Sequence, residues 1–106
     1  MPKIDNTKTQ QPSLTESGIK KGILRHCIPN PATDSTIVTY EVYTEGSVEI
    51  KVYIVLGQPV LDLLQGVKQI GICNIVISLW GLSTGLYHYV MFVDGLKVDG
   101  KKLVVE

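Results

Sequence analysis

Hydrophobic and polar side chains alternate along this chain with a period of two, most clearly over residues 47–56. The apolar residues of that stretch occupy every second position, and they are Val48, Ile50, Val52, Ile54 and Leu56. The positions between them include Glu49, Lys51 and Tyr53. Successive side chains of a strand point to opposite faces, so the pattern predicts a strand with one face in a core and the other in water.

Residues 72–80 alternate in the same way. One face would carry Cys73, Ile75, Ile77 and Leu79, and the other Asn74, Val76, Ser78 and Trp80. Residues 60–69 are ambiguous, because their apolar positions also fit a short amphipathic helix. Pro59, Gly66 and the neighbouring strands favour a strand there.

Turn residues recur about every 10 positions after residue 30, and β-branched and aromatic runs lie between them. The expected turns include Gln65-Gly66, Asp94-Gly95 and Asp99-Gly100. This spacing predicts an all-β fold, an immunoglobulin-like antiparallel β-sandwich of about seven strands. The expected strands are residues 24–28, 36–44, 47–56, 60–64, 72–80, 85–93 and 101–105. Residues 1–22 are mostly polar and predict a flexible linker or disordered arm, and residues 23–106 predict the folded domain.

Tyr87 follows Gly85 at the start of a predicted late strand. In immunoglobulin-like sandwiches a tyrosine at such a position bonds back to the preceding corner, so we expect Tyr87 to be structural. An inward Tyr87 places Tyr89, Met91 and Val93 inward as well. His88, Val90 and Phe92 would then face outward, and Val90 and Phe92 would form a small docking surface if they were uncovered.

The ten basic and ten acidic residues cancel, which argues against a nucleic-acid partner. No apolar run is long enough to span a bilayer, and the first residues lack the apolar core of a signal peptide. Lys97, Lys101 and Lys102 gather late in the chain among acidic residues, as on a solvated face.

The sequence holds no recognisable catalytic constellation, metal site or cofactor motif, so we expect a protein that is not an enzyme. His26 and Cys27 are adjacent, but neighbours on a strand point to opposite faces and could not form a nucleophile–base pair. His88 stands alone. Cys27 and Cys73 either pair as a disulfide or remain buried free thiols.

Four motifs occur in order: Pro29-Asn30-Pro31-Ala32, a hairpin around Gly57, the Gly85–Tyr87 corner, and a closing lysine-containing strand, Lys101-Lys102-Leu103-Val104-Val105. In this order they resemble the type A C-terminal sorting domain of the bacterial type IX secretion system. The resemblance covers residues 24–106. Even without it, Asn30 between two prolines predicts a stiff, extended segment. The apolar ending predicts that the last strand is built into a sheet edge.

The resemblance implies a folded sandwich that ends a larger exported protein and directs that cargo through the outer membrane. The expected partners are the type IX translocon and a C-terminal signal peptidase, which would cut before residue 24. The protein would cross the periplasm and reach the outer-membrane surface or the medium. By resemblance, the residues recognised would be Pro29, Asn30, Pro31, Ala32, Gly85, Tyr87, Lys101, Lys102, Leu103, Val104 and Val105.

Two alternatives remain open from the residues. One is a non-catalytic immunoglobulin-like or fibronectin-like binding module of a surface adhesin or glycosidase, for which Trp80 and Tyr53 would form a stacking platform if exposed together. The other is an inert spacer domain. A binding module would hold a ligand and stay on the mature protein, whereas a sorting domain would be cut away.

Overall fold

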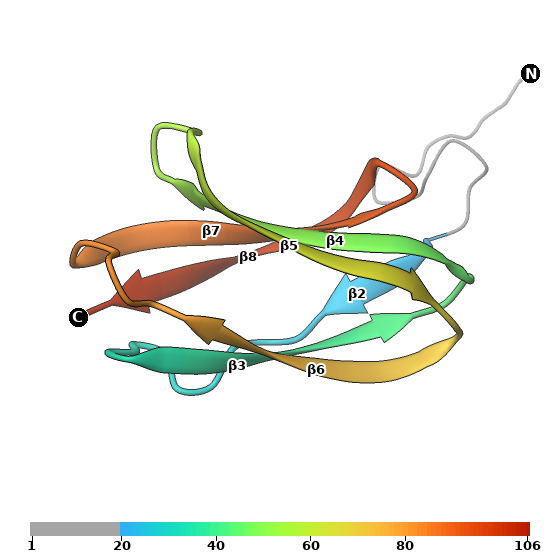
Figure 1. Cartoon of the computed structure of the whole chain (residues 1–106), viewed down its shortest axis with the longest axis horizontal. Helices are drawn as coiled ribbons and strands as arrows, with labels where there is room; N and C mark the ends of the chain where they lie inside the picture. Colours follow the sequence, from blue (N-terminus) through green and yellow to red (C-terminus); the bar gives the residue numbers. More distant parts are fainter. Residues whose placement is uncertain (1–19) are drawn as a thin grey trace, which may run out of the picture.

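The structure, a computed structural model, describes residues 20–106, and in them seven strands form two packed sheets (Figure 1). The strands are β2 (Gly22–Leu24), β3 (Ser35–Val42), β4 (Gly46–Ile54), β5 (Pro59–Lys68), β6 (Gly71–Ser78), β7 (Gly85–Val93) and β8 (Leu96–Val105). The smaller sheet has the order β2-β3-β6, and the larger has the order β5-β4-β7-β8. The predicted all-β sandwich is confirmed.

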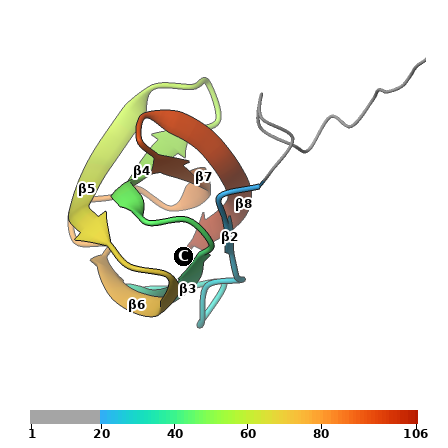
Figure 2. The same ribbon diagram turned by 90° about the vertical axis from the view of Figure 1, so that its right-hand side faces the viewer.

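Every pair of named strands is antiparallel. Counted along the chain, the first, second and fifth strands (β2, β3 and β6) share one sheet. The third, fourth, sixth and seventh strands (β4, β5, β7 and β8) share the other. This distribution is an immunoglobulin-like arrangement in which the fourth strand pairs with the third. Seen along the strands, β2 lies beside β8 and closes one side of the sandwich (Figure 2).

The core is formed by the inward faces of both sheets, as the alternation predicted. Its fully buried members include Val38 and Tyr40 on β3, Ile50 and Val52 on β4, Ile77 on β6, Tyr89 and Met91 on β7, and Leu103 on β8. Burying each large aliphatic side chain contributes about 1.5–3 kcal/mol to folding. Leu56 was expected on this face, but it lies in the turn after β4 and is 92% exposed.

The last hairpin differs from its prediction. Asp94 and Gly95 both have positive φ, 52° and 83°, and join Val93 directly to Leu96. This is the backbone of a type I′ turn, which Asp-Gly favours because its twist matches that of the strands. The final strand therefore begins at Leu96 rather than Lys101, and the predicted Asp99-Gly100 turn lies inside the strand.

Strand β5 resolves the ambiguous segment in favour of strand and extends it to Lys68. A turn was predicted at Gln65-Gly66, but these residues form a bulge between the pairs Glu49–Leu64 and Val48–Gly66. Gly66 supplies the positive φ of 78° that such a bulge accommodates. The first strand is also shifted, because it spans Gly22–Leu24 rather than 24–28. The predicted linker covers residues 1–22, of which residues 1–19 lie outside the described residues and Gly22 begins β2.

Candidate functional site

The tyrosine corner brings two of the predicted recognition residues against the last strand. The Tyr87 hydroxyl donates a hydrogen bond to the carbonyl oxygen of Ser83 at 2.6 Å, four residues upstream. This confirms the structural role expected of Tyr87. In the β7–β8 ladder, Gly85 lies opposite Val105 and Tyr87 lies opposite Leu103.

The other edge of β8 is covered by residues 29–32, which we call the strap. The Asn30 side-chain amide donates to the carbonyl oxygen of Lys102 at 3.1 Å. Its Oδ1 accepts the backbone N–H of Val104 at 2.8 Å. A carboxamide carries one donor group and one acceptor, so Asn30 takes the place of a peptide group on a neighbouring strand.

Ala32 continues the same edge with its main chain. Its N–H donates to the carbonyl oxygen of Val104 at 2.9 Å, and its own carbonyl accepts the N–H of Glu106 at 2.8 Å. Ala32 thereby forms a parallel bridge with Val105 and is 1% exposed. The strap thus satisfies three backbone groups of β8 and the N–H of Glu106, which an open sheet edge would leave available for pairing.

The strap is also tied to the smaller sheet. The hydroxyl of Thr36, a fully buried residue on β3, donates to the carbonyl oxygen of Pro29 at 2.8 Å. Neither proline has an N–H group that would need a partner, and both X–Pro bonds of the strap are cis. Residues 29–32 therefore join the two sheets at the side where β8 lies.

The chain leading to the strap is held by Tyr89 and Asp99. The buried Tyr89 hydroxyl accepts the N–H of Cys27 at 2.9 Å and donates to the carbonyl oxygen of Arg25 at 2.8 Å. Burial raises the pKa of Tyr89 above its ordinary value. Asp99 accepts the N–H of Leu24 at 2.7 Å through Oδ2. Residues 24–32 therefore follow β8 from Asp99 to Glu106.

Among the predicted recognition residues, the structure separates those that a partner could reach from those inside the core. Leu103, Val105, Ala32 and Tyr87 are all buried. Pro29, Asn30, Pro31 and Lys102 are exposed, and Lys101, Val104 and Gly85 are half-buried. A partner that binds the folded domain would thus contact the strap and the outer side chains of β8.

Sequence reasoning missed Tyr89, Asp99 and Thr36 as supports of this site. The alternation placed Tyr89 inward correctly. No local signal in the sequence identifies the backbone groups of residues 25 and 27 as its partners, since these lie more than 60 positions away in the chain.

The cysteines are free thiols in the structure. Cys27 is buried, with its Sγ 4.0 Å from the carbonyl oxygen of Lys102. Cys73 is half-buried on β6 opposite Tyr40. The sequence left open whether Cys27 and Cys73 pair as a disulfide, and in the structure they are unpaired.

His26 is exposed whereas Cys27 is buried, as expected for neighbours on extended chain. Residues 20–106 contain no cluster of three or more His, Cys, Asp or Glu side chains arranged to hold a metal ion. In this same range, no helix has the length and apolarity needed to cross a membrane.

The stacking platform proposed for a binding module is not formed. Trp80 follows β6 of the smaller sheet and is 91% exposed, and the neighbouring Leu79 is buried. Tyr53 lies on the outer face of β4 in the larger sheet, next to the buried Val52. The two aromatic side chains therefore belong to opposite sheets of the sandwich.

The fold and this edge define an immunoglobulin-like sandwich whose first segment and last strand form one structural unit. The model of the family described as "Secretion system C-terminal sorting domain" matches residues 26–106. The chain belongs to this family of C-terminal secretion signals, as the resemblance predicted. A sorting domain acts on the protein that carries it, so this one belongs with an exported protein, and its family favours a non-catalytic role.

Comparison with curated proteins gives no match. Among solved structures, the chain is similar to the crystal structure of a "putative beta-galactosidase" from Bacteroides fragilis. The sequences are 20% identical, and the match covers 83% of this chain but only 16% of that one. The TM-score is 0.33, a likeness too weak to bear on function.

Replacing Asn30 with alanine is expected to lower the free energy of unfolding by about 1 kcal/mol, because two exposed hydrogen bonds are lost. The local effect should be larger than the global one. Amide hydrogen exchange at Val104 should accelerate relative to the centre of the β4–β7 ladder. Asn74→Ala, which removes an exposed side-chain bond to Thr39, is the matched control and should leave exchange at Val104 unchanged.

Proposed function

We propose that this domain is recognised in its folded state by the type IX translocon, through the strap and the outer side of β8. The observation that carries the proposal is the Asn30 carboxamide, which bonds to the backbone of both Lys102 and Val104. The two sequence motifs farthest apart in the chain thereby share one surface. A partner could read this surface only when the sandwich is formed.

The exposed members of the surface supply the contacts. Pro29, Asn30 and Pro31 present a rigid segment, and Lys102 places a cation beside it. Leu103 and Val105 act indirectly, since they are buried and hold β8 in the sheet. The domain itself performs no chemistry in this role.

We further propose that a C-terminal signal peptidase removes the domain after export. A cut before Gly22 would leave every named strand intact, because β2 begins at that residue. The cargo would cross the periplasm before this cut and would afterwards be at the outer-membrane surface or in the medium. The residues before Gly22 would serve as the linker that presents the cleaved bond.

The test is a secretion assay with a periplasm-targeted fluorescent reporter fused to residues 18–106 in a bacterium that has a type IX system. Reporter should reach the surface or medium only when the domain is intact and the translocon is present. A translocon-deficient strain and a fusion ending at Gly100 are the controls. Retention of the reporter in the periplasm beside a folded domain would overturn the proposal, and the size of the released reporter would locate the cut.

A further inference from the structure

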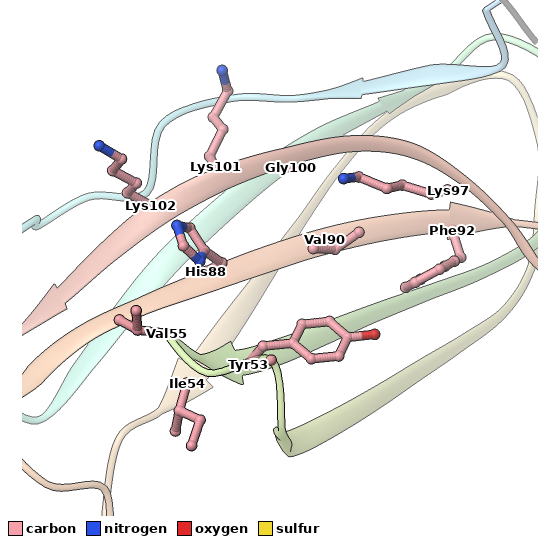
Figure 3. Close-up of a pocket in the computed structure, with 11 residues that line it drawn as sticks. Tyr53, Ile54, Val55, His88, Val90, Phe92, Lys97, Gly100, Lys101 and Lys102 are labelled. Carbon is pink, nitrogen blue, oxygen red and sulfur yellow. The ribbon is translucent and has the colours of Figure 1, made fainter.

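The outer face of the larger sheet carries a hollow of about 600 Å³ (Figure 3). The turn after β4 borders it at one end, where Gly57 donates its N–H to the carbonyl oxygen of Ile54 at 2.8 Å. Strand β8 borders it on the opposite side. No residue of the strap lines this hollow, although Lys102, whose carbonyl oxygen accepts a hydrogen bond from Asn30, does.

The floor of the hollow is apolar. Val90 is 9% exposed, and Tyr53 and Phe92 are half-buried beside it. Val90 lies opposite Gly100 in the β7–β8 ladder, so no side chain of β8 covers it from that position. A Cβ atom built on Gly100 would lie 3.6 Å from Cγ2 of Val90, an ordinary contact distance. A side chain at residue 100 would therefore fill part of the space above the floor.

The rim of the hollow is cationic. Lys97, Lys101 and Lys102 of β8 line this side of the hollow, as does His88 of β7, opposite Lys102. Lys97 reaches over β7 toward Val90, whereas the side chains of Lys101 and Lys102 extend from β8 away from the floor (Figure 3). No carboxylate is among the described residues that line the hollow. The acidic side chains of this face, Glu49 and Asp62, lie on β4 and β5, where a hydrogen bond between the two carboxyl groups favours protonated Glu49 and raises its pKa.

Lys51 separates these two regions. Its Nζ lies 5.5 Å from the centre of the Phe92 ring and 3.8 Å from Oε2 of Glu49. The face is therefore polarised across the sheet, with positive charge over β7 and β8, although the chain as a whole carries equal numbers of acidic and basic residues. Such local charge favours an anionic partner.

We propose that this hollow binds an acidic peptide segment of a partner protein, with apolar side chains on the floor and carboxylates at the lysine rim. An extended peptide presents both, because its side chains alternate. Phosphate groups are bound preferentially by arginine forks and free backbone N–H groups. The single arginine, Arg25, pairs with Glu41 on the other sheet at 3.1 Å, and β7 and β8 pair with each other along their length.

This inference goes beyond the sorting role, because it names the chemistry of a ligand and places it outside the strap. It does not depend on the secretion route. Its test uses purified components, whereas the sorting proposal is tested by secretion in cells. Failure of one therefore leaves the other standing.

The test is a titration of the full, isotopically labelled chain with a synthetic peptide of about eight residues in which Glu alternates with Val, followed by NMR. We expect saturable shifts confined to the amides around Val90, Phe92 and Gly100, and weaker binding as salt is raised. The peptide with Gln in place of Glu should bind at least about fivefold more weakly.

Two variants locate the site. Lys97→Glu should weaken binding about fivefold or more by reversing a rim charge. Gly100→Val should weaken it by filling the floor. Lys68→Glu makes the same charge change on β5, outside the hollow, and should bind like the parent. The proposal would be overturned if the acidic peptide did not bind, or if it bound all variants equally. It would also be overturned if tripolyphosphate bound saturably and the acidic peptide did not.

Discussion

Replacing Leu103 with alanine is expected to lower the free energy of unfolding by about 2–5 kcal/mol, the range for truncating a buried leucine. Leu103 is fully buried on β8, opposite Tyr87. Its removal leaves a cavity between the sheets at the strand to which the strap is bonded. Since small domains have only about 5–15 kcal/mol of stability, this one substitution would remove a large share.

Urea denaturation followed by fluorescence measures this change. Leu86→Ala is the control, because Leu86 lies on the adjacent strand but is 39% exposed. We expect that variant to lose less than half as much stability. Equal losses for Leu86→Ala and Leu103→Ala would contradict the burial of the last strand in the core.

The Tyr89→Phe substitution is expected to cost about 1–3 kcal/mol, because a buried donor loses its acceptor. The ring remains, so packing is preserved, but the N–H of Cys27 and the carbonyl of Arg25 lose the hydroxyl that joins them. Denaturation of this variant beside Tyr53→Phe isolates the effect. Tyr53 has no side-chain hydrogen bond among the described residues, and its variant should stay within about 0.5 kcal/mol of the parent.

The same substitution has a pH signature. Burial raises the pKa of Tyr89 in the folded domain, whereas the unfolded chain ionises near pH 10. Its contribution to stability is therefore complete below about pH 10 and is lost as pH rises toward the folded pKa, because the unfolded state then binds fewer protons. Tyr89→Phe should make the loss of stability above pH 10 shallower. Tyr40, whose pKa burial also raises, should account for part of the remaining slope.

The strands of the core were predictable because their signal is local. Val48, Ile50 and Val52 alternate with polar residues, and all three are buried. The orientation of β7 followed from Tyr87 in the same way. A pattern of period two predicts which face of the sheet each side chain lies on, and burial of the apolar face then fixes the register.

Turn and bulge residues were harder to distinguish, because both use the same amino acids. Turns were predicted at Gly66 and Gly100, yet both residues lie within strands. A glycine indicates either a backbone conformation that other residues avoid or a position where a side chain would clash with a neighbour. Which of these applies depends on the strand alongside, and that strand is distant in the sequence.

The contacts of the strap likewise depend on segments that are distant in the sequence. The sequence placed the two prolines at the start of the sandwich and the apolar ending in a sheet edge, and β8 is an edge strand of the larger sheet. The bonds from Asn30 to Lys102 and Val104 span more than 70 residues. They arise only when the two sheets close around the core, so no local pattern encodes them.

The central claim is that the strap and the last strand are recognised as one folded surface, and secretion of the Asn30→Ala reporter fusion tests it most directly. Its export should be compared with that of the Asn74→Ala fusion at a temperature where both domains are folded. We predict that secretion falls with Asn30→Ala, in step with faster exchange at Val104, and is unchanged with Asn74→Ala. Normal secretion of an Asn30→Ala fusion whose strap has separated from β8 would contradict the account.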